Sequence, residues 1–181
     1  MTTLYLVRHG ETVANAAQIL QGWQGGELNE TGKAQAHDVA EKMRNERIDV
    51  FVASDLRRAI QTCTIIASAK GVNQEGIVTT PLLRERDWGS FTGKFIPDLE
   101  NVEWPDDVES LEHMKSRAQN FFDMGKDYLS QQGCARSWPW HHKQGNTEHV
   151  FQEADERNTQ DAQCGGKNPY AVNICKIMRV R

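Results

Sequence analysis

The sequence predicts an α/β domain of three layers, in which a mostly parallel central sheet is flanked by helices. Two observations predict this fold class. Short, mainly apolar runs, such as Thr3–Val7 and Ile48–Ala53, are typical of strands covered by helices on both faces. These runs alternate along the chain with longer segments whose apolar residues recur at helical spacing.

The expected elements follow one another closely up to about residue 129. They are a strand at 3–7, a helix from 28–32 to about 47, a strand at 48–53, a helix at 59–69, a short strand near 77–79 and a helix at 110–129. Asn29 or Thr31 is expected to cap the first helix, and Gly71 to end the second. Residues 84–110 contain glycines and prolines that interrupt regular structure, so we expect a loop there.

The segment after the last expected helix differs from the rest of the chain. A domain of this kind should continue with another buried strand, but residues 133–169 are polar, with only isolated apolar residues. We therefore expect the C-terminal strand to be absent or disordered. The predicted organisation is an incomplete domain over residues 1–132 and a polar, atypical tail over residues 133–181.

Length and composition restrict the class of protein. The chain has 181 residues, of which 38% are hydrophobic and 25% charged, and a formal net charge of −4. These values favour one soluble domain over a protein that binds nucleic acid or a membrane. No apolar run approaches the roughly 20 residues that span a bilayer. The four cysteines lack disulfide-framework spacing, so we expect reduced thiols and a cytoplasmic location. The sequence indicates no oligomeric state.

Polar motifs follow each of the first three expected strands. Arg8-His9-Gly10 comes after the first, residues 54–59 (Ser-Asp-Leu-Arg-Arg-Ala) after the second, and residues 83–89 (Leu-Arg-Glu-Arg-Asp-Trp-Gly) after the third. Ligands of open α/β sheets bind beyond the carboxyl ends of the strands, so these motifs should converge. Arginines match phosphate oxygens, a neutral imidazole can attack phosphorus, and a glutamic acid with a pKa raised by burial can protonate a leaving alkoxide. Each motif alone is more often structural or solvent-exposed, but their ordered combination points to phosphoryl chemistry.

The combination resembles the histidine phosphatase superfamily, which includes cofactor-dependent phosphoglycerate mutases and small phosphomonoesterases. The resemblance covers about residues 3 to 130. Its motifs are Val7-Arg8-His9-Gly10-Glu11-Thr12 with Asn15, residues 28–32 (Leu-Asn-Glu-Thr-Gly), residues 54–62 (Ser-Asp-Leu-Arg-Arg-Ala-Ile-Gln-Thr), residues 83–85 (Leu-Arg-Glu) and residues 88–93 (Trp-Gly-Ser-Phe-Thr-Gly).

The resemblance implies four catalytic residues. His9 would be the nucleophile that becomes phosphorylated, and Glu85 would be the general acid. Arg8 and Arg58 would hold the phosphate, because Arg58 is the arginine directly before Ala59 and thus the one that matches the motif.

Three further residues are implied as substrate-binding. Asn15 would add a neutral contact to the phosphate, and Gln21 and Gly22 match a loop that lines the substrate pocket in the family. No metal and no cofactor are implied, because the arginines supply the positive charge. The expected partner is a small-molecule phosphate ester.

The family contains both hydrolases and mutases. The short segment after Glu85 and the run at residues 87–93 look more like the phosphatases, whereas mutases usually carry longer insertions there. We therefore expect a phosphomonoester hydrolase that works through a phosphohistidine on a small metabolite. The alternative is a phosphoryl transfer of the phosphoglycerate mutase type. The choice of ester is expected to depend on the loop at residues 86–115.

One part of the family pattern is missing from this chain. The family carries a second histidine in a Gly-His-Gly motif at the end of a late buried strand, and the chain contains no such motif. In its place stand residues 137–145, Ser-Trp-Pro-Trp-His-His-Lys-Gln-Gly. Reading the codons of Trp138–Gly145 from their second base gives Gly, then His if the third base of the Pro139 codon is A, then Gly.

We therefore hypothesise that residues from about Gly133 onward are a frameshifted reading of an ordinary phosphatase gene. The same frame then reaches a stop codon at Val172-Asn173 if the third base of the Val172 codon is A or G. The alternative is a natural, divergent tail in which His141 or His142 replaces the missing histidine. A zinc site is a weaker alternative because its candidate ligands fit no structural zinc spacing; they are His141, His142, His149 and Cys164.

A further alternative is that this chain is a catalytically impaired, non-enzymatic relative, because it lacks the second catalytic histidine. Such a protein would keep the first two-thirds of the fold and bind at most a phosphate or a partner.

Overall fold

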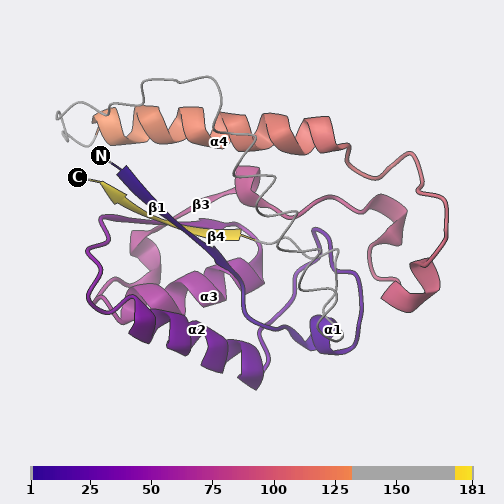
Figure 1. Cartoon of the computed structure of the whole chain (residues 1–181), viewed down its shortest axis with the longest axis horizontal. Coiled ribbons are helices and arrows are strands. Elements are labelled where there is room, and N and C mark those ends of the chain that lie inside the picture. The colour runs from indigo at the N-terminus through magenta and orange to yellow at the C-terminus, as the bar shows by residue number, and fades with distance from the viewer. Residues whose placement is uncertain (1, 132–173, 181) are drawn as a thin grey trace. The chain divides into compact units, whose positions relative to one another are not determined.

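The computed structural model describes residues 2–131 and 174–180. All of them belong to one unit of the chain, which takes in residues 1–136 and 172–181. The strands are β1 (Thr2–Arg8), β2 (Val50–Ser54), β3 (Ile77–Thr80) and β4 (Ile174–Val180), and the α-helices are α1 (Val13–Ala16), α2 (Glu30–Lys42), α3 (Arg57–Ser68) and α4 (Leu111–Gln131) (Figure 1). Single 3₁₀ turns lie at Gln74–Gly76, Pro81–Leu83, Gly89–Phe91 and Ile96–Leu99. No helix in this described part is long and apolar enough to cross a membrane.

The four strands form one mixed sheet in the order β1-β4-β2-β3. β2 and β3 pair in parallel, whereas β4 pairs antiparallel with β1 on one side and with β2 on the other. The first three strands therefore run in one direction, as predicted, but only β2 and β3 among them are direct neighbours.

The prediction that the C-terminal strand is absent is wrong, because β4 occupies the position between β1 and β2. Its register joins Thr2 to Val180 along β1, and Val50 to Met178 along β2. A strand here satisfies backbone N–H and C=O groups on the facing edges of both neighbours, which would otherwise lack partners. The run Ile-Cys-Lys-Ile-Met-Arg-Val is rich in residues that favour strands, but the long polar stretch before it gives no sign that a strand follows. The predicted domain limit at residue 132 stays a prediction, since residues 132–173 lie outside the described residues.

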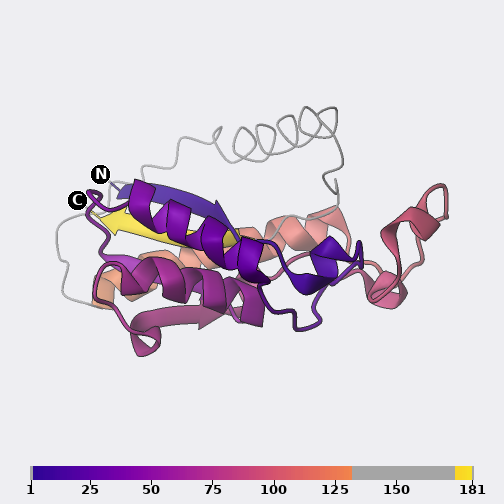
Figure 2. The same cartoon turned by 90° about the horizontal axis from the view of Figure 1, so that it is seen from below.

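Successive side chains of the strands enter two apolar clusters on opposite faces of the sheet. Phe51 and Ala53 of β2 pack with residues of α2 and α3, whereas Val52 packs with Phe121 of α4. This alternation is the expected consequence of the two-residue period of a strand. The described unit thus has three layers, with α2 and α3 on one face of the sheet and α4 on the other (Figure 2).

The helix ends follow the local sequence closely. Asn29 is the N-cap of α2 and accepts a hydrogen bond from the amide of Gly32, which confirms one of the two predicted caps. The helix ends at Lys42, short of the predicted residue 47. Helix α1 was not predicted, because its four residues are stabilised by a capping box between Thr12 and Asn15 and not by an apolar periodicity.

Candidate active site

His9 lies directly after β1 and is only 5% exposed. Its Nδ1 lies 2.6 Å from the backbone oxygen of Gly10, so Nδ1–H donates to that carbonyl and leaves the lone pair of the neutral ring on Nε2. Nε2 is buried and has no hydrogen-bond partner among the described residues. Burial lowers the pKa of His9 to about 3; the hydrogen bond to Gly10 opposes this effect, and the charges of Arg58 and Arg8 add to it. The site therefore presents a buried, neutral imidazole nitrogen whose pKa is further lowered by two nearby cations.

The turn after β1 is fixed by backbone contacts that require glycine. A Cβ on Gly10 would lie 2.2 Å from the backbone oxygen of Gly32, in the first turn of α2. The amide of Gly10 donates to Oγ1 of Thr62 at 3.2 Å, and the same hydroxyl donates to the backbone oxygen of Arg58 at 2.9 Å. These contacts tie the chain beside His9 to both α2 and α3.

Arg58 lies in the first turn of α3 and is completely buried. Its Nη1 donates to the backbone oxygen of Gln24 at 2.8 Å, and its Nη2 donates to that of Gly22 at 2.7 Å and to Oε2 of Glu85 at 2.9 Å. Burial lowers the pKa of Arg58, and the negative charge of Glu85 partly offsets this effect. The neighbouring Arg57 is exposed and pairs with Glu27 at 2.7 Å.

Glu85 follows the turn after β3 and is 3% exposed. Its Oε2 accepts from Arg58, and its Oε1 accepts from Nε1 of Trp88 at 3.1 Å. Two N–H donors on the two oxygens are the partners of an ionised carboxylate. Both carboxylate oxygens of Glu85 therefore accept a hydrogen bond from a described N–H donor.

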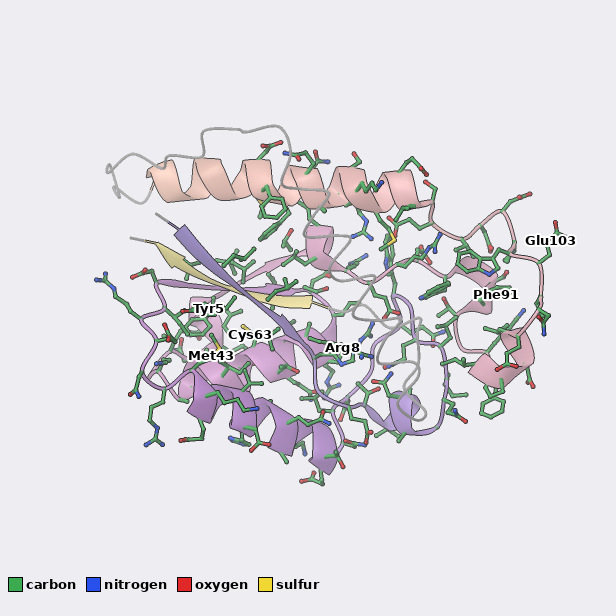
Figure 3. All side chains as sticks on the ribbon, in the orientation of Figure 1. Tyr5, Arg8, Met43, Cys63, Phe91 and Glu103 are labelled. Carbon is green, nitrogen blue, oxygen red and sulfur yellow. The ribbon has the colours of Figure 1, made fainter. Side chains whose placement is uncertain are left out.

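Of the other predicted site residues, Gly22 contacts this group directly, through its backbone oxygen and Arg58. Arg8 is exposed and lies at the end of β1 (Figure 3). Asn15 is half-buried, and its Oδ1 accepts from the amide of Thr12 at 3.2 Å and from the Thr12 hydroxyl at 2.8 Å. Gln21 and Gly22 are buried, and Gly22 has a φ of 50°, which glycine adopts without strain. The residues proposed to replace the second histidine, or to bind zinc, lie outside the described residues.

Sequence reasoning missed a set of residues that hold Glu85 in place. The backbone oxygen of Glu85 accepts from Nε1 of Trp23 at 2.8 Å and from Nη2 of Arg117 at 3.3 Å. Arg117 also donates to both carboxylate oxygens of Glu109, from Nε at 2.6 Å and from Nη2 at 2.7 Å. The signal available in the sequence was weak, because Arg117 and Glu109 lie more than 20 residues from the motif that contains Glu85.

The chain resembles curated proteins over part of its length. It is 44% identical over 106 residues to the probable phosphoglycerate mutase GpmB of Yersinia pestis strain Pestoides F, a match that covers 58% of this chain and 48% of that protein. The GpmB protein of Yersinia pseudotuberculosis serotype O:1b gives the same values. The chain therefore spans about half the length of the curated relatives it matches.

Solved structures share the fold. A mycobacterial glucosyl-3-phosphoglycerate phosphatase, solved as a complex with VO3, superposes with a TM-score of 0.61 at 24% identity, covering 70% of this chain and 67% of that one. The alpha-ribazole phosphatase of Shigella flexneri gives a TM-score of 0.61 at 22% identity, covering 72% and 69%.

Comparison with protein families matches most of the chain to one superfamily. The sequence pattern of the histidine phosphatase superfamily, branch 1, matches residues 4–133, a span that includes the ends of β1, β2 and β3 and all the described residues around His9. Since this match takes in well over half of the sequence, the chain belongs to branch 1 of the histidine phosphatase superfamily.

Proposed function

We propose that this chain is a phosphomonoester hydrolase that acts through a phosphohistidine on a small phosphorylated metabolite. The observation that carries the proposal is the state of His9, whose Nε2 is buried, neutral and unpartnered among the described residues, close to Arg58 and Arg8. A neutral imidazole nitrogen beside two cations suits attack on a phosphate dianion, because the cations offset its negative charge.

In the first step, the lone pair of His9 Nε2 forms a bond to phosphorus, and the ester P–O bond breaks. The electron pair of that bond leaves with the alcohol oxygen, which takes a proton from Glu85. In the second step, water attacks the phosphohistidine, the P–N bond breaks, and its electron pair returns to Nε2. Glu85 accepts the proton of the attacking water, so it is restored after each cycle.

The contact between Arg58 and Glu85 gives a physical reason for this change of roles. In the described structure Arg58 donates to Glu85, which favours the ionised carboxylate. Phosphate oxygens that take over the Nη2 donor of Arg58 would remove this stabilisation, so that Glu85 binds a proton more readily. Substrate binding and protonation of the general acid are thereby coupled.

The test is turnover of a generic phosphate ester, such as para-nitrophenyl phosphate, by the chain and by His9→Ala. We expect the variant to lose activity about 1,000-fold or more and to form no acid-labile phosphoenzyme when mixed with labelled substrate. His37→Ala is the matched control, because His37 is an exposed imidazole on α2. Equal rates for the chain and His9→Ala would rule the proposal out.

A second candidate function is phosphoryl transfer between hydroxyl groups, as in a mutase. The relatives at 44% identity are named probable phosphoglycerate mutases, whereas the two solved structures described above are named phosphatases for a glucosyl-phosphoglycerate and for alpha-ribazole. The fate of the phosphoryl group separates the two functions. A phosphohistidine that is discharged to water favours hydrolysis, and one that is discharged to phosphoglycerate favours the mutase.

A reduced activity is the third outcome to test, because the family match ends at residue 133 and the Gly-His-Gly motif is missing. The frameshift hypothesis predicts base A at the third position of the Pro139 codon, which sequencing of codons 130 to 175 will check. Deleting one base before codon 138 should then produce Gly-His-Gly and raise the hydrolysis rate about 100- to 1,000-fold, as expected for one charge-stabilising contact. Because the same frame stops at Val172-Asn173, a strand of the restored sequence would have to replace β4 between β1 and β2. Another base at Pro139, or no gain in rate, would contradict it.

A further inference from the structure

Trp23 is an exposed aromatic residue in the segment that holds Arg58. It lies between Gly22 and Gln24, whose backbone oxygens both accept hydrogen bonds from the Arg58 guanidinium. The residue keeps 36% of its surface exposed, although its neighbour Gly22 is buried. An exposed indole beside a proposed phosphate site is a candidate contact for the rest of the substrate.

Two contacts fix the orientation of this indole. Its Nε1 donates to the backbone oxygen of Glu85 at 2.8 Å. The guanidinium of Arg84 lies over the ring, with Cζ 4.7 Å from its centroid. Arg84 is itself held by Asp55, through Nε to Oδ1 at 2.8 Å and Nη2 to Oδ2 at 2.5 Å. The ring is thus placed in advance of binding, and little conformational entropy remains to be lost there.

The position of Trp23 beside Glu85 indicates which part of the substrate would contact the indole. Glu85 is the residue that gives a proton to the leaving oxygen in the proposed function, so the alcohol portion of the ester lies on the side of Glu85. Trp23 is bonded to the backbone of this same residue. The organic part of the leaving alcohol is therefore the part that can reach the indole.

The chemistry around Trp23 favours a neutral ring over a second anionic group. Arg84 is the cation nearest to the indole in the described contacts, and its charge is matched by Asp55 in a two-point pair. The charge of Asp55 opposes recruitment of another carboxylate or phosphate at this position. An indole face binds the apolar face of a sugar or base ring without any need for charge.

We infer that Trp23 is a specificity-determining residue, and that the preferred substrates are phosphate esters whose leaving alcohol carries a sugar or nucleoside ring. This inference rests on the proposed function for its orientation of the ester. It distinguishes ring-bearing esters from short acyclic ones such as phosphoglycerates.

The experiment compares glucose 6-phosphate with glycerol 3-phosphate, because both carry a single phosphate on a primary alcohol and differ chiefly in the ring. For Trp23→Ala, kcat/KM for the glucose ester should fall about ten-fold, mainly through KM, while that for the glycerol ester changes less than about three-fold. Trp23→Phe keeps an aromatic face and should retain most of the preference for the ring. Phe95→Ala is the control, because Phe95 is another aromatic residue, 41% exposed, that lies outside the segment Gly22–Gln24.

Binding of the same two esters to His9→Ala, measured by calorimetry, separates this inference from the proposed function. The proposed function fails if the chain and His9→Ala hydrolyse para-nitrophenyl phosphate at equal rates, yet a ring preference in binding that disappears in Trp23→Ala still supports the role of Trp23. Equal losses for both esters in Trp23→Ala, or an unchanged preference for the glucose ester, would overturn the inference. Circular dichroism of each variant checks that the fold is retained.

Discussion

The start of α3 and the end of β1 each carry one arginine whose charge acts on His9. The two arginines differ in how far they are buried. Arg58 is completely buried, and its donors are shared among two backbone carbonyls and the carboxylate of Glu85. Arg8 is exposed at the end of its strand. One cation is therefore part of the folded structure, and the other is open to solvent before any ligand arrives.

This difference separates two roles of a charged residue in an active site, which are stabilising the fold and binding the substrate. Removal of Arg58 would leave the buried carboxylate of Glu85 without its cation, which is costly because charge is poorly solvated there. Partial burial lowers the pKa of Arg8 and the charge of Glu85 opposes this effect, but removal of Arg8 would leave Glu85 paired with Arg58. Substitutions at the two positions should therefore affect stability very differently, even if both reduce activity.

The largest expected effect is that of Arg58→Met, which keeps the length and apolar part of the side chain. We expect the free energy of unfolding to fall by about 3–5 kcal/mol, the usual loss when one partner of a buried ion pair is removed. Urea denaturation followed by circular dichroism measures it. Arg57→Met is the matched control, since Arg57 is the next residue and forms an exposed pair with Glu27; its effect should stay within about 0.5 kcal/mol. Similar losses for the two variants would contradict the comparison.

The second prediction concerns the pH dependence that His9 imposes. Its folded pKa of about 3 lies below the ordinary value of 6.5, so between these values the unfolded chain binds a proton that the folded chain does not. The stability contributed by the neutral ring is complete above about pH 6.5 and is lost as the pH falls toward 3, with a slope of up to about 1.4 kcal/mol per pH unit. His9→Gln should remove this component from urea denaturation curves recorded from pH 4 to 7.

The control for that slope is His37→Gln, which changes an exposed histidine of α2. Curves for the chain and His9→Gln that run parallel over the whole range would show that His9 is not buried in its neutral form.

The part of the site that could be predicted from the sequence is the part carried by side chains in short motifs. His9, Arg58 and Glu85 each follow a strand; Arg58 donates to Glu85, and the charge of Arg58 lowers the pKa of His9. The hydrogen bonds from Arg58 to the backbone oxygens of Gly22 and Gln24 could not be predicted in this way. Every residue has a backbone carbonyl, so the residue type does not indicate which carbonyl accepts the bond. The exposure of Arg8 and the burial of Arg58 likewise depend on packing and not on residue type.

Strand β4 is the part of the fold that the local sequence does not predict. The strands with an apolar run next to a helix were all expected, whereas β4 is recognisable only from the gap that it fills between β1 and β2. Its strand-forming residues are clear in hindsight, but a pairing partner more than 100 residues away leaves no local pattern.

The third prediction tests how tightly the end of β1 is held. Gly10→Ala should lower the free energy of unfolding by about 1–3 kcal/mol, because its Cβ would lie 2.2 Å from the backbone oxygen of Gly32, which cannot move without displacing α2. Gly25→Ala is the matched control, since a Cβ there has no atom within 4 Å. Thermal denaturation of the two variants measures the difference, and an equal change in both would show that β1 is not fixed against α2.

The smallest expected effect on stability is that of Arg8→Gln, and it is the one that sharpens the comparison most. Because Arg8 is exposed, its loss should change the free energy of unfolding by no more than about 0.5 kcal/mol. Its charge contributes to lowering the pKa of His9, and in the proposed function it holds the phosphate that His9 attacks. Activity toward a phosphate ester should therefore fall about 100-fold or more, as for removal of one charge-stabilising donor. A stable variant with full activity would assign the phosphate to Arg58 alone, whereas a stable variant with little activity would show that the exposed arginine binds substrate and contributes nothing to folding.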